Sequence, residues 1–300
     1  MPKRVLITDP IAEEGIEKLR AHGLEVDLKP DLKGDALVQG IQGYHVLIVR
    51  SATKVTRAVI EAADVLEIIG RAGVGLDNID LEAAKERGIK VLNTPGATAI
   101  SVAELTLGLI LGCLRAIPYL DRALRTGRWE KKRKGIELYG KTVGIIGLGR
   151  IGSEVAKRLQ VFGAKVLAYD PYAKDSPWAE RVDLETLLRN ADIITLHVPL
   201  TPETRHLINA DRIRQMKDGA ILINTARGGI VDEQALYDAL VSGKLRAAAL
   251  DVFETEPLPQ DHPLRSLDQV ILTPHTGAQT EEGQIRAAVE LADRILQELS

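Results

Sequence analysis

The sequence predicts an α/β protein made of two doubly wound parallel-sheet domains. Short apolar runs rich in Val, Ile and Leu alternate with segments of helical spacing, which is typical of parallel strands covered by helices on both faces. Two such series occur, in residues 1–92 and in residues 141–273. A length of 300 residues also favours two domains over one.

Strands are predicted where an apolar run is bounded by turn residues or by helical spacing. The strands of the first series are Val5–Ile7, Val46–Val49 and Leu66–Ile69. The strands of the second series are Val143–Ile146, Val166–Ala168, Ile193–Leu196, Ala220–Ile223, Ala247–Leu250 and Val270–Leu272.

The segments between and after the two series are predicted to be mainly helical. Ser101–Glu104 has the capping-box pattern and opens an apolar helix that Pro118 should end or bend. The following basic segment, Arg122–Lys134, has little apolar period, so we expect a solvated connecting loop. Ala278–Leu299 has helical spacing again and is expected to pass back over the first domain.

The composition excludes several classes of protein. With 45% hydrophobic residues, 27% charged residues and a net charge of −3, the chain has no general attraction to nucleic acid or to an anionic membrane. No stretch reaches the ~18 to 20 apolar residues of a membrane span, and the N-terminus lacks the apolar region of a signal peptide. The single cysteine, Cys113, is predicted to be a buried, inert thiol in a reducing, cytoplasmic setting. We expect no metal site.

Three glycines follow the predicted strand Val143–Ile146 in the hexapeptide Gly-Leu-Gly-Arg-Ile-Gly. Alone this spacing is weak, but a helical segment and a second strand ending in Asp170 follow, as a dinucleotide-binding unit requires. Gly147 then permits the turn, Gly149 lets the backbone approach a pyrophosphate, and Gly152 allows close packing. Asp170 would bind ribose hydroxyls and repel a 2′-phosphate, so NAD is the predicted cofactor. The alternative to dinucleotide binding is that the three glycines form a plain structural turn.

Polar residues follow three later strands at the same predicted sheet edge: Arg227, Glu256 and His275. His275 has the titration range to exchange a hydroxyl proton, Glu256 would stabilise its imidazolium, and the Arg227 guanidinium suits a carboxylate. Taken singly, a histidine after proline is usually a turn residue and a glutamate before proline is usually exposed. Asp251 is predicted either to lie near the nicotinamide or to cap the following loop.

With these motifs the chain resembles the D-isomer-specific 2-hydroxyacid dehydrogenase family over nearly its whole length. The residues that carry the resemblance are 49–56, 70–80, 93–96, 101–104, 147–152, 224–233, 249–257 and 273–278. The resemblance implies that Arg227, Glu256 and His275 are catalytic. It implies a Rossmann-type NAD-binding domain over residues 98–275 and a smaller, flavodoxin-like substrate-binding domain over residues 1–97 and 276–300. It also implies a homodimer formed through the nucleotide-binding domains.

Further contacts are implied by the same resemblance. Besides the glycines and Asp170, the cofactor contacts are Val74, Arg150, Ile151, Val198, Thr225, Asp251 and Gly277. The substrate contacts are Arg50, Ser51, Arg71, Gly73 and Gly75, and the two arginines favour a doubly anionic, phosphorylated 2-hydroxy acid.

The activity that the resemblance implies is NAD-dependent oxidation of D-3-phosphoglycerate to 3-phosphohydroxypyruvate, which leads to serine. The alternatives are a glyoxylate or hydroxypyruvate reductase, another D-2-hydroxyacid dehydrogenase, or an NAD-sensing binding protein. Many related enzymes continue into C-terminal regulatory domains, and we expect no such regulation in a chain that stops at residue 300.

Overall fold

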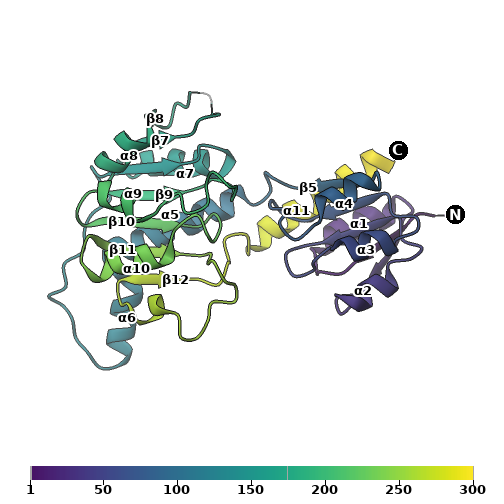
Figure 1. Cartoon of the computed structure of the whole chain (residues 1–300), viewed down its shortest axis with the longest axis horizontal. Helices are drawn as coiled ribbons and strands as arrows, with labels where there is room; N and C mark the ends of the chain where they lie inside the picture. The colour runs from purple at the N-terminus through teal and green to yellow at the C-terminus, as the bar shows by residue number, and fades with distance from the viewer. Residues whose placement is uncertain (1, 174, 300) are drawn as a thin grey trace. The chain divides into compact units, whose positions relative to one another are not determined.

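The computed structural model describes residues 2–173 and 175–299, and the contacts within the chain divide it into two units (Figure 1). The first unit comprises the residues up to Ala99 together with those from Ala278 onward, and the second comprises Ile100–Gly277. Each boundary lies two residues after the predicted one. The assignment of the units to substrate and nucleotide binding stays a prediction.

The first unit contains a five-stranded parallel sheet with the order β2-β1-β3-β4-β5. This order is that of flavodoxin-like folds, so the predicted architecture is confirmed. The strands are β1 (Arg4–Ile7), β2 (Glu25–Leu28), β3 (Val46–Val49), β4 (Ile68–Arg71) and β5 (Lys90–Asn93). The helices are α1 (Glu13–Ala21), α2 (Asp35–Gly40), α3 (Arg57–Ala62), α4 (Leu81–Glu86) and α11 (Glu281–Leu299).

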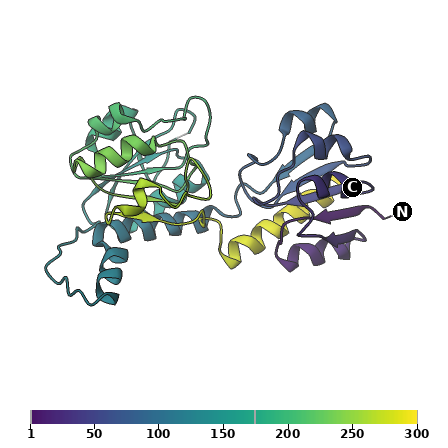
Figure 2. The ribbon, with the colours of Figure 1, turned by 60° about the horizontal axis from the view of Figure 1, so that its bottom comes forward.

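Both faces of this sheet are buried, because successive side chains of each strand point to opposite sides. Leu47 and Val49 of β3 pack with residues of α2, α3 and α4, whereas Val46 and Ile48 pack with residues of α1 and α11. Helices α1 and α11 touch closely: a Cβ at Gly15 would lie 2.7 Å from the Cβ of Ala288. Figure 2 shows α11, in yellow, running along the first unit. The last helix therefore completes the core of the first unit.

The second unit contains a seven-stranded parallel sheet with the order β12-β11-β10-β9-β6-β7-β8. Helices α5 and α7 pack on one face and α8, α9 and α10 on the other, as a doubly wound fold requires. The strands are β6 (Thr142–Ile146), β7 (Lys165–Tyr169), β8 (Glu180–Arg181), β9 (Ile193–Leu196), β10 (Ala220–Asn224), β11 (Leu245–Leu250) and β12 (Val270–Leu272). The helices are α5 (Ala99–Arg115), α6 (Ile117–Arg125), α7 (Arg150–Val161), α8 (Leu184–Asn190), α9 (Ala210–Gln215), α10 (Glu233–Val241) and the 3₁₀ turn η1 (Pro263–Ser266).

Every predicted strand is present, and three further strands are β2, β5 and β8. Each of these is an edge strand, and each carries charged or polar residues that the search for apolar runs passes over. Edge strands tolerate such residues because one side of the strand has no partner. The predicted strands were therefore the inner strands of each sheet together with β12.

The helices between the two sheets differ in part from the prediction. α5 begins at Ala99, two residues before Ser101, so the prediction of Ser101 as a helix cap is wrong. Ala116 has a left-handed backbone (φ 51°), Pro118 lies in the first turn of α6, and the two helices meet at 62°, which confirms the predicted bend. Within residues 2–173 and 175–299, no single helix has both the length and the apolar character to cross a membrane, although the bent pair α5 and α6 passes that test jointly.

Candidate active site

The second sheet brings the carboxyl ends of its strands to one edge. Through successive strand pairs, Ile146 of β6 lies beside Leu196 of β9, which lies beside Asn224 of β10. Asn224 lies beside Leu250 of β11, and Leu250 beside Leu272 of β12. The residues that follow these strand ends therefore gather at the same edge, as predicted.

The glycine loop after β6 has the shape that a dinucleotide requires. Gly147 has a φ of 97°, and a Cβ there would lie 2.6 Å from the carbonyl of His197. A Cβ at Gly152 would lie 2.0 Å from the Gly147 oxygen, so α7 can pack this closely only with glycine. A Cβ at Gly149, the residue before α7, would meet nothing within 4 Å. Open space at a helix N-terminus fits a bound pyrophosphate, so the residues present fit NAD.

Asp170 directly follows β7 and holds this loop. One carboxylate oxygen accepts a hydrogen bond from the Leu148 amide at 2.8 Å, and the other accepts the amides of Tyr172 at 2.8 Å and Ala173 at 3.0 Å. A carboxylate has about four acceptor positions, so one remains for a ribose hydroxyl. Its negative charge disfavours the additional phosphate of NADP, which supports the predicted preference for NAD.

His275 and Glu256 form a hydrogen-bonded pair beyond the ends of β12 and β11. Nδ1 of His275 lies 2.8 Å from Oε2 of Glu256, and Oε1 of Glu256 accepts the amide of Phe253 at 3.0 Å. The His275 side chain is 47% exposed. Because the carboxylate engages Nδ1, the ring offers Nε2 for proton exchange. The pair therefore has the arrangement of a positioned acid or base and its orienting carboxylate.

Asp251 fixes the backbone that carries His275. Its carboxylate is fully buried and accepts hydrogen bonds from Oγ1 of Thr273 at 2.6 Å and from the amides of Thr276 and Gly277, each at 2.8 Å. The Asp251 carbonyl also accepts the amide of His275, whose φ is 53°. This geometry favours the loop-capping interpretation of Asp251. Contacts of Asp251 and Gly277 with the cofactor stay predictions.

Arg227 lies on the loop after β10, next to the loop that leads to Glu256. The Asn224 side chain fixes this loop by donating to the Arg227 carbonyl at 2.9 Å and accepting the Ala226 amide at 3.0 Å. A Cβ at Gly228 would lie 1.8 Å from the Phe253 oxygen, so the two loops are in direct contact. The Arg227 Nη1 donates to the Ala226 carbonyl at 2.7 Å. The structure thus places the Arg227 loop beside the Glu256 loop.

The remaining cofactor candidates of the second unit lie at the same edge. Thr225 is buried, and its hydroxyl lies 2.9 Å from that of Thr106 in α5, so its side chain also serves the packing of α5. Arg150 and Ile151 open α7, and Val198 lies beside Gly147. Their roles toward NAD stay predictions.

The substrate candidates lie in the first unit, after two neighbouring strands. Arg50 follows β3, and Arg71 ends β4, paired with Val49. The Arg71 guanidinium rests on the backbone of Gly73, because a Cβ at Gly73 would lie 2.0 Å from Nη1 of Arg71. The carbonyl of Gly73 accepts the Thr94 amide at 2.9 Å, and that of Val74 accepts the Asn93 side chain at 2.6 Å. Ser51 and Gly75 lie on these two loops, and their contacts with substrate stay predictions.

One polar side chain at the edge of the second sheet was missed in the sequence. His197 follows β9, and its Nε2 lies 3.0 Å from the Thr195 hydroxyl, while its buried Nδ1 has no hydrogen-bond partner among the described residues. Burial lowers the pKa of His197 to about 3, so its ring is neutral near pH 7. A histidine directly after a predicted strand was the signal that could have drawn attention to it.

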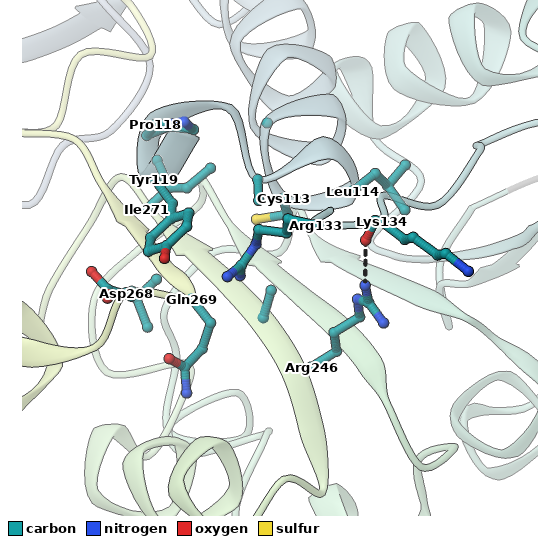
Figure 3. Close-up of a pocket in the computed structure, with 14 residues that line it drawn as sticks. Cys113, Leu114, Pro118, Tyr119, Arg133, Lys134, Arg246, Asp268, Gln269 and Ile271 are labelled. Carbon is teal, nitrogen blue, oxygen red and sulfur yellow. Dashed lines mark hydrogen bonds between the residues drawn. The ribbon is translucent and has the colours of Figure 1, made fainter. Parts of the chain in front are cut away.

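A separate cavity lies at the opposite edge of the second sheet (Figure 3). It has a volume of about 120 Å³ and is lined by residues of α5 and α6 and by the first residues of β11 and β12. Cys113 lies in its wall, and burial raises the pKa of the thiol to about 12, which confirms the predicted inert cysteine. This cavity is therefore remote from the strand ends that carry His275.

The basic segment Arg122–Lys134 is not simply a connecting loop. Its first residues belong to α6, so the prediction is wrong for Arg122–Arg125. The rest folds back on the same helix: the Tyr119 hydroxyl donates to Glu130 at 2.6 Å, and the Arg133 guanidinium lies 4.1 Å from the centre of the Tyr119 ring.

Among the described residues, no group of three or more His, Cys, Asp or Glu side chains is arranged to hold a metal ion.

Comparison with known proteins extends these observations. Residues 107–277 match the family described as D-isomer specific 2-hydroxyacid dehydrogenase, NAD binding domain. The chain is 55% identical over 298 residues to a D-3-phosphoglycerate dehydrogenase of Methanocaldococcus jannaschii, covering 97% of this chain but 56% of that protein. It is 54% identical over 302 residues to a hydroxypyruvate reductase of Thermotoga maritima, covering 99% of this chain and 98% of that protein. A solved structure from Thermus thermophilus superposes with a TM-score of 0.91 at 39% identity, covering 99% and 96% of the two chains. The chain thus spans little more than half the length of the first of these relatives.

Proposed function

From the premise that this chain belongs to the D-isomer-specific 2-hydroxyacid dehydrogenase family, we propose that it oxidises D-3-phosphoglycerate to 3-phosphohydroxypyruvate with NAD. The observation that carries the proposal is the 2.8 Å contact of His275 with Glu256, at the sheet edge that also holds the glycine loop. A proton-exchanging pair beside a dinucleotide loop is what oxidation of an alcohol needs.

In this reaction His275 takes the proton of the substrate C2 hydroxyl at Nε2. Glu256 keeps the ring oriented through Nδ1 and stabilises the imidazolium that forms. Arg227 binds the substrate carboxylate and the oxygen that becomes a carbonyl, since a guanidinium can donate two parallel hydrogen bonds to them. Bound NAD supplies the acceptor for the hydride that leaves C2. The loop from Thr273 to Gly277, held by Asp251, keeps His275 in place.

The preference for a phosphorylated substrate is supported by the first unit. Arg50 and Arg71 follow adjacent strands, and both carry a permanent positive charge. Two guanidinium groups at one sheet edge suit a phosphate in addition to the carboxylate. The D-3-phosphoglycerate dehydrogenase name of the Methanocaldococcus jannaschii relative agrees with this choice, and it would assign the reaction to serine biosynthesis.

Hydroxypyruvate reduction is the second candidate function. The Thermotoga maritima relative that bears this name is matched over 98% of its length. A panel of phosphorylated and unphosphorylated 2-hydroxy and 2-oxo acids, followed through NADH absorbance in both directions, distinguishes the two. We expect kcat/KM to be highest for D-3-phosphoglycerate and its oxo acid. A higher value for hydroxypyruvate would replace the proposed substrate, and no turnover with any acid would favour an NAD-sensing binding protein.

We further propose that the protein acts as a cytoplasmic homodimer joined through the second units. Ile117 and Leu124 of α6 are 54% and 58% exposed, and Trp129 beyond it is 78% exposed. Such exposed apolar side chains on one short segment favour an interface with another chain. Sedimentation equilibrium should give twice the chain mass of 32.7 kDa, and Leu124→Glu should shift the protein toward monomer. The unpaired Cys113 agrees with a reducing compartment.

A further inference from the structure

The Arg50 side chain is a cation held by uncharged groups. Its Nη2 donates to Oε1 of Gln279 at 3.2 Å and its Nη1 donates to the Pro10 carbonyl at 3.4 Å. In the part of the chain that the structure describes, no carboxylate forms an ion pair with it. Partial burial lowers the pKa of Arg50, but a guanidinium stays charged at neutral pH. Asp9 acts on this charge through space but does not pair with it, so the guanidinium can still attract an anion.

The backbone that carries Arg50 is gripped from one side by Asp9. Oδ2 of Asp9 accepts the amides of Arg50 at 2.7 Å and of Thr53 at 3.0 Å, and Oδ1 accepts the Thr53 hydroxyl at 2.8 Å. Asp9 is only 2% exposed. Burial alone would raise the pKa of Asp9, but these hydrogen bonds outweigh it, so the pKa lies below its ordinary value. Asp9 is thus an ionised carboxylate whose hydrogen bonds all hold the segment from Arg50 to Thr53.

Asn78 grips the same loop through its carbonyl groups. Its side-chain nitrogen donates to the Arg50 carbonyl at 2.8 Å and to the Thr53 carbonyl at 2.7 Å. Asp9 and Asn78 therefore fix both the amide and the carbonyl groups of the first and last residues of the segment Arg50–Thr53. A loop held at both ends in this way loses little further entropy when a ligand binds.

The charged groups around the segment Arg50–Thr53 favour binding of an anion. The Lys33 ammonium lies 3.4 Å from Oδ1 of Asp9 and compensates its charge, whereas among the described residues Arg50 feels the charge of Asp9 but forms no ion pair. Lys33, Asp9 and Arg50 together carry one net positive charge, which favours an anion beside them. Burying a carboxylate is costly unless it is fully bonded, and the three hydrogen bonds of Asp9 together with Lys33 meet that condition.

We propose that Asp9 and Asn78 are positioning residues that hold Arg50 for the second anionic group of the substrate, and so set the preference for phosphorylated over unphosphorylated 2-hydroxy acids. This inference rests on the proposed function. Gln279 orients the guanidinium itself, and the Gln284 side chain supports it by donating to Gln279 at 2.9 Å. Neither Asp9 nor Asn78 needs to touch the substrate.

The test is steady-state kinetics of Asp9→Ala and Asn78→Ala with D-3-phosphoglycerate and with D-glycerate, which lacks the phosphate. For D-3-phosphoglycerate we expect KM to rise about tenfold and kcat to stay within about twofold, because a misplaced cation weakens binding without changing proton transfer. The kcat/KM for D-glycerate should stay within about twofold. An equal loss on both substrates, or no loss on either, overturns the inference.

The conservative variant Asp9→Asn separates geometry from charge. Its carbonyl oxygen can still accept both backbone amides, and its nitrogen can donate to the Thr53 hydroxyl, so KM should return to within about threefold of the unmodified protein. A KM as high as that of Asp9→Ala would overturn the positioning role. Asp64→Ala is the matched control, since Asp64 also accepts two backbone amides in the first unit, those of Gly43 and Val65, and it should leave both substrates unchanged.

Arg50→Ala distinguishes failure of the inference from failure of the proposed function. If Arg50→Ala leaves the KM for D-3-phosphoglycerate unchanged, the phosphate assignment itself is wrong. If Arg50→Ala raises KM but neither Asp9→Ala nor Asn78→Ala does, the function stands and the inference is overturned. If Asp9→Ala does not fold, as judged by its circular dichroism, the same criteria applied to Asn78→Ala decide.

Discussion

The two units share one architecture but present different chemistry at the ends of their strands. Both are parallel sheets with helices on both faces. In the first unit, strands β3 and β4 lead into Arg50 and Arg71, which offer fixed charge. In the second unit, β6, β11 and β12 lead into the glycine loop, Glu256 and His275, for which we propose cofactor binding and proton exchange. The fold thus supplies an edge, and the residues beyond each strand decide what that edge does.

This difference predicts that substitutions in the two units affect different kinetic constants, and steady-state kinetics can test that prediction. If proton transfer occurs in the second unit, as we propose, changes there should lower kcat, whereas changes in the first unit should raise KM, because they weaken substrate binding. Mixed effects from either unit would show that binding and chemistry are not divided in this way.

The largest expected effect comes from His275→Gln. Glutamine cannot take the hydroxyl proton, and proton transfer by a placed group contributes ~10²–10⁴-fold, so kcat should fall by about 10² or more. NAD affinity, measured by fluorescence titration, should stay within about threefold, since the glycine loop and Asp170 are unchanged. Unchanged turnover would remove His275 from the mechanism.

A smaller effect, of a different kind, is expected from Arg50→Ala. Loss of one hydrogen-bonded ion pair with a substrate phosphate costs about 1.5–3 kcal/mol, which corresponds to a KM roughly 10- to 100-fold higher for D-3-phosphoglycerate. The kcat at saturation should stay within about threefold. A fall in kcat with unchanged KM would contradict the assignment of Arg50 to binding alone.

The last prediction concerns the free energy of unfolding. At neutral pH we expect no pH-dependent difference between the two units, whereas in acid the second unit should lose stability first. His197 has a folded-state pKa of about 3 against an ordinary value of 6.5, so the unfolded chain takes up a proton first as the pH falls. This contribution to the stability of the second unit is complete above pH 6.5 and is lost progressively down to pH 3, by about 5 kcal/mol in all. The lowered pKa of Asp9 in the first unit acts only further into acid, as the pH falls from its ordinary value of 3.8 through its lower folded value.

Denaturant titrations at pH 7, 5 and 4 test this contrast. Both tryptophans, Trp129 and Trp178, belong to the second unit, so their fluorescence follows its unfolding. His197→Gln should flatten the dependence on pH between 6.5 and 3. An unchanged slope in that variant would assign the acid sensitivity to another group.

The sequence revealed those parts of the molecule that depend on local pattern. Buried strands such as β3 and β9 are apolar throughout and were predicted with the observed bounds. The pairing of His275 with Glu256 followed from a simple rule, that parallel strands end at one edge. Edge strands such as β2 carry charged residues and were missed.

The contacts that hold the loops could not be predicted in this way. Asp9 meets Arg50 and Thr53 across 41 and 44 positions of sequence, and nothing in the local pattern around Asp9 indicates those partners. Likewise, the sequence does not distinguish a cofactor contact from a loop cap for Asp251, whereas its hydrogen bonds with Thr273, Thr276 and Gly277 favour the loop cap. Such contacts depend on tertiary structure, because a buried acceptor is matched to whichever donors the fold brings to it.

The return of α11 to the first unit has a consequence for the order in which the protein is made. Leu291, Ala292 and Ile295 of this helix fill the same core as Val5 and Ile7 at the start of the chain. On the ribosome, the second unit is complete once Gly277 has emerged, whereas the earlier residues still lack one wall of their core. The half that is synthesised first is therefore the half that can finish folding last.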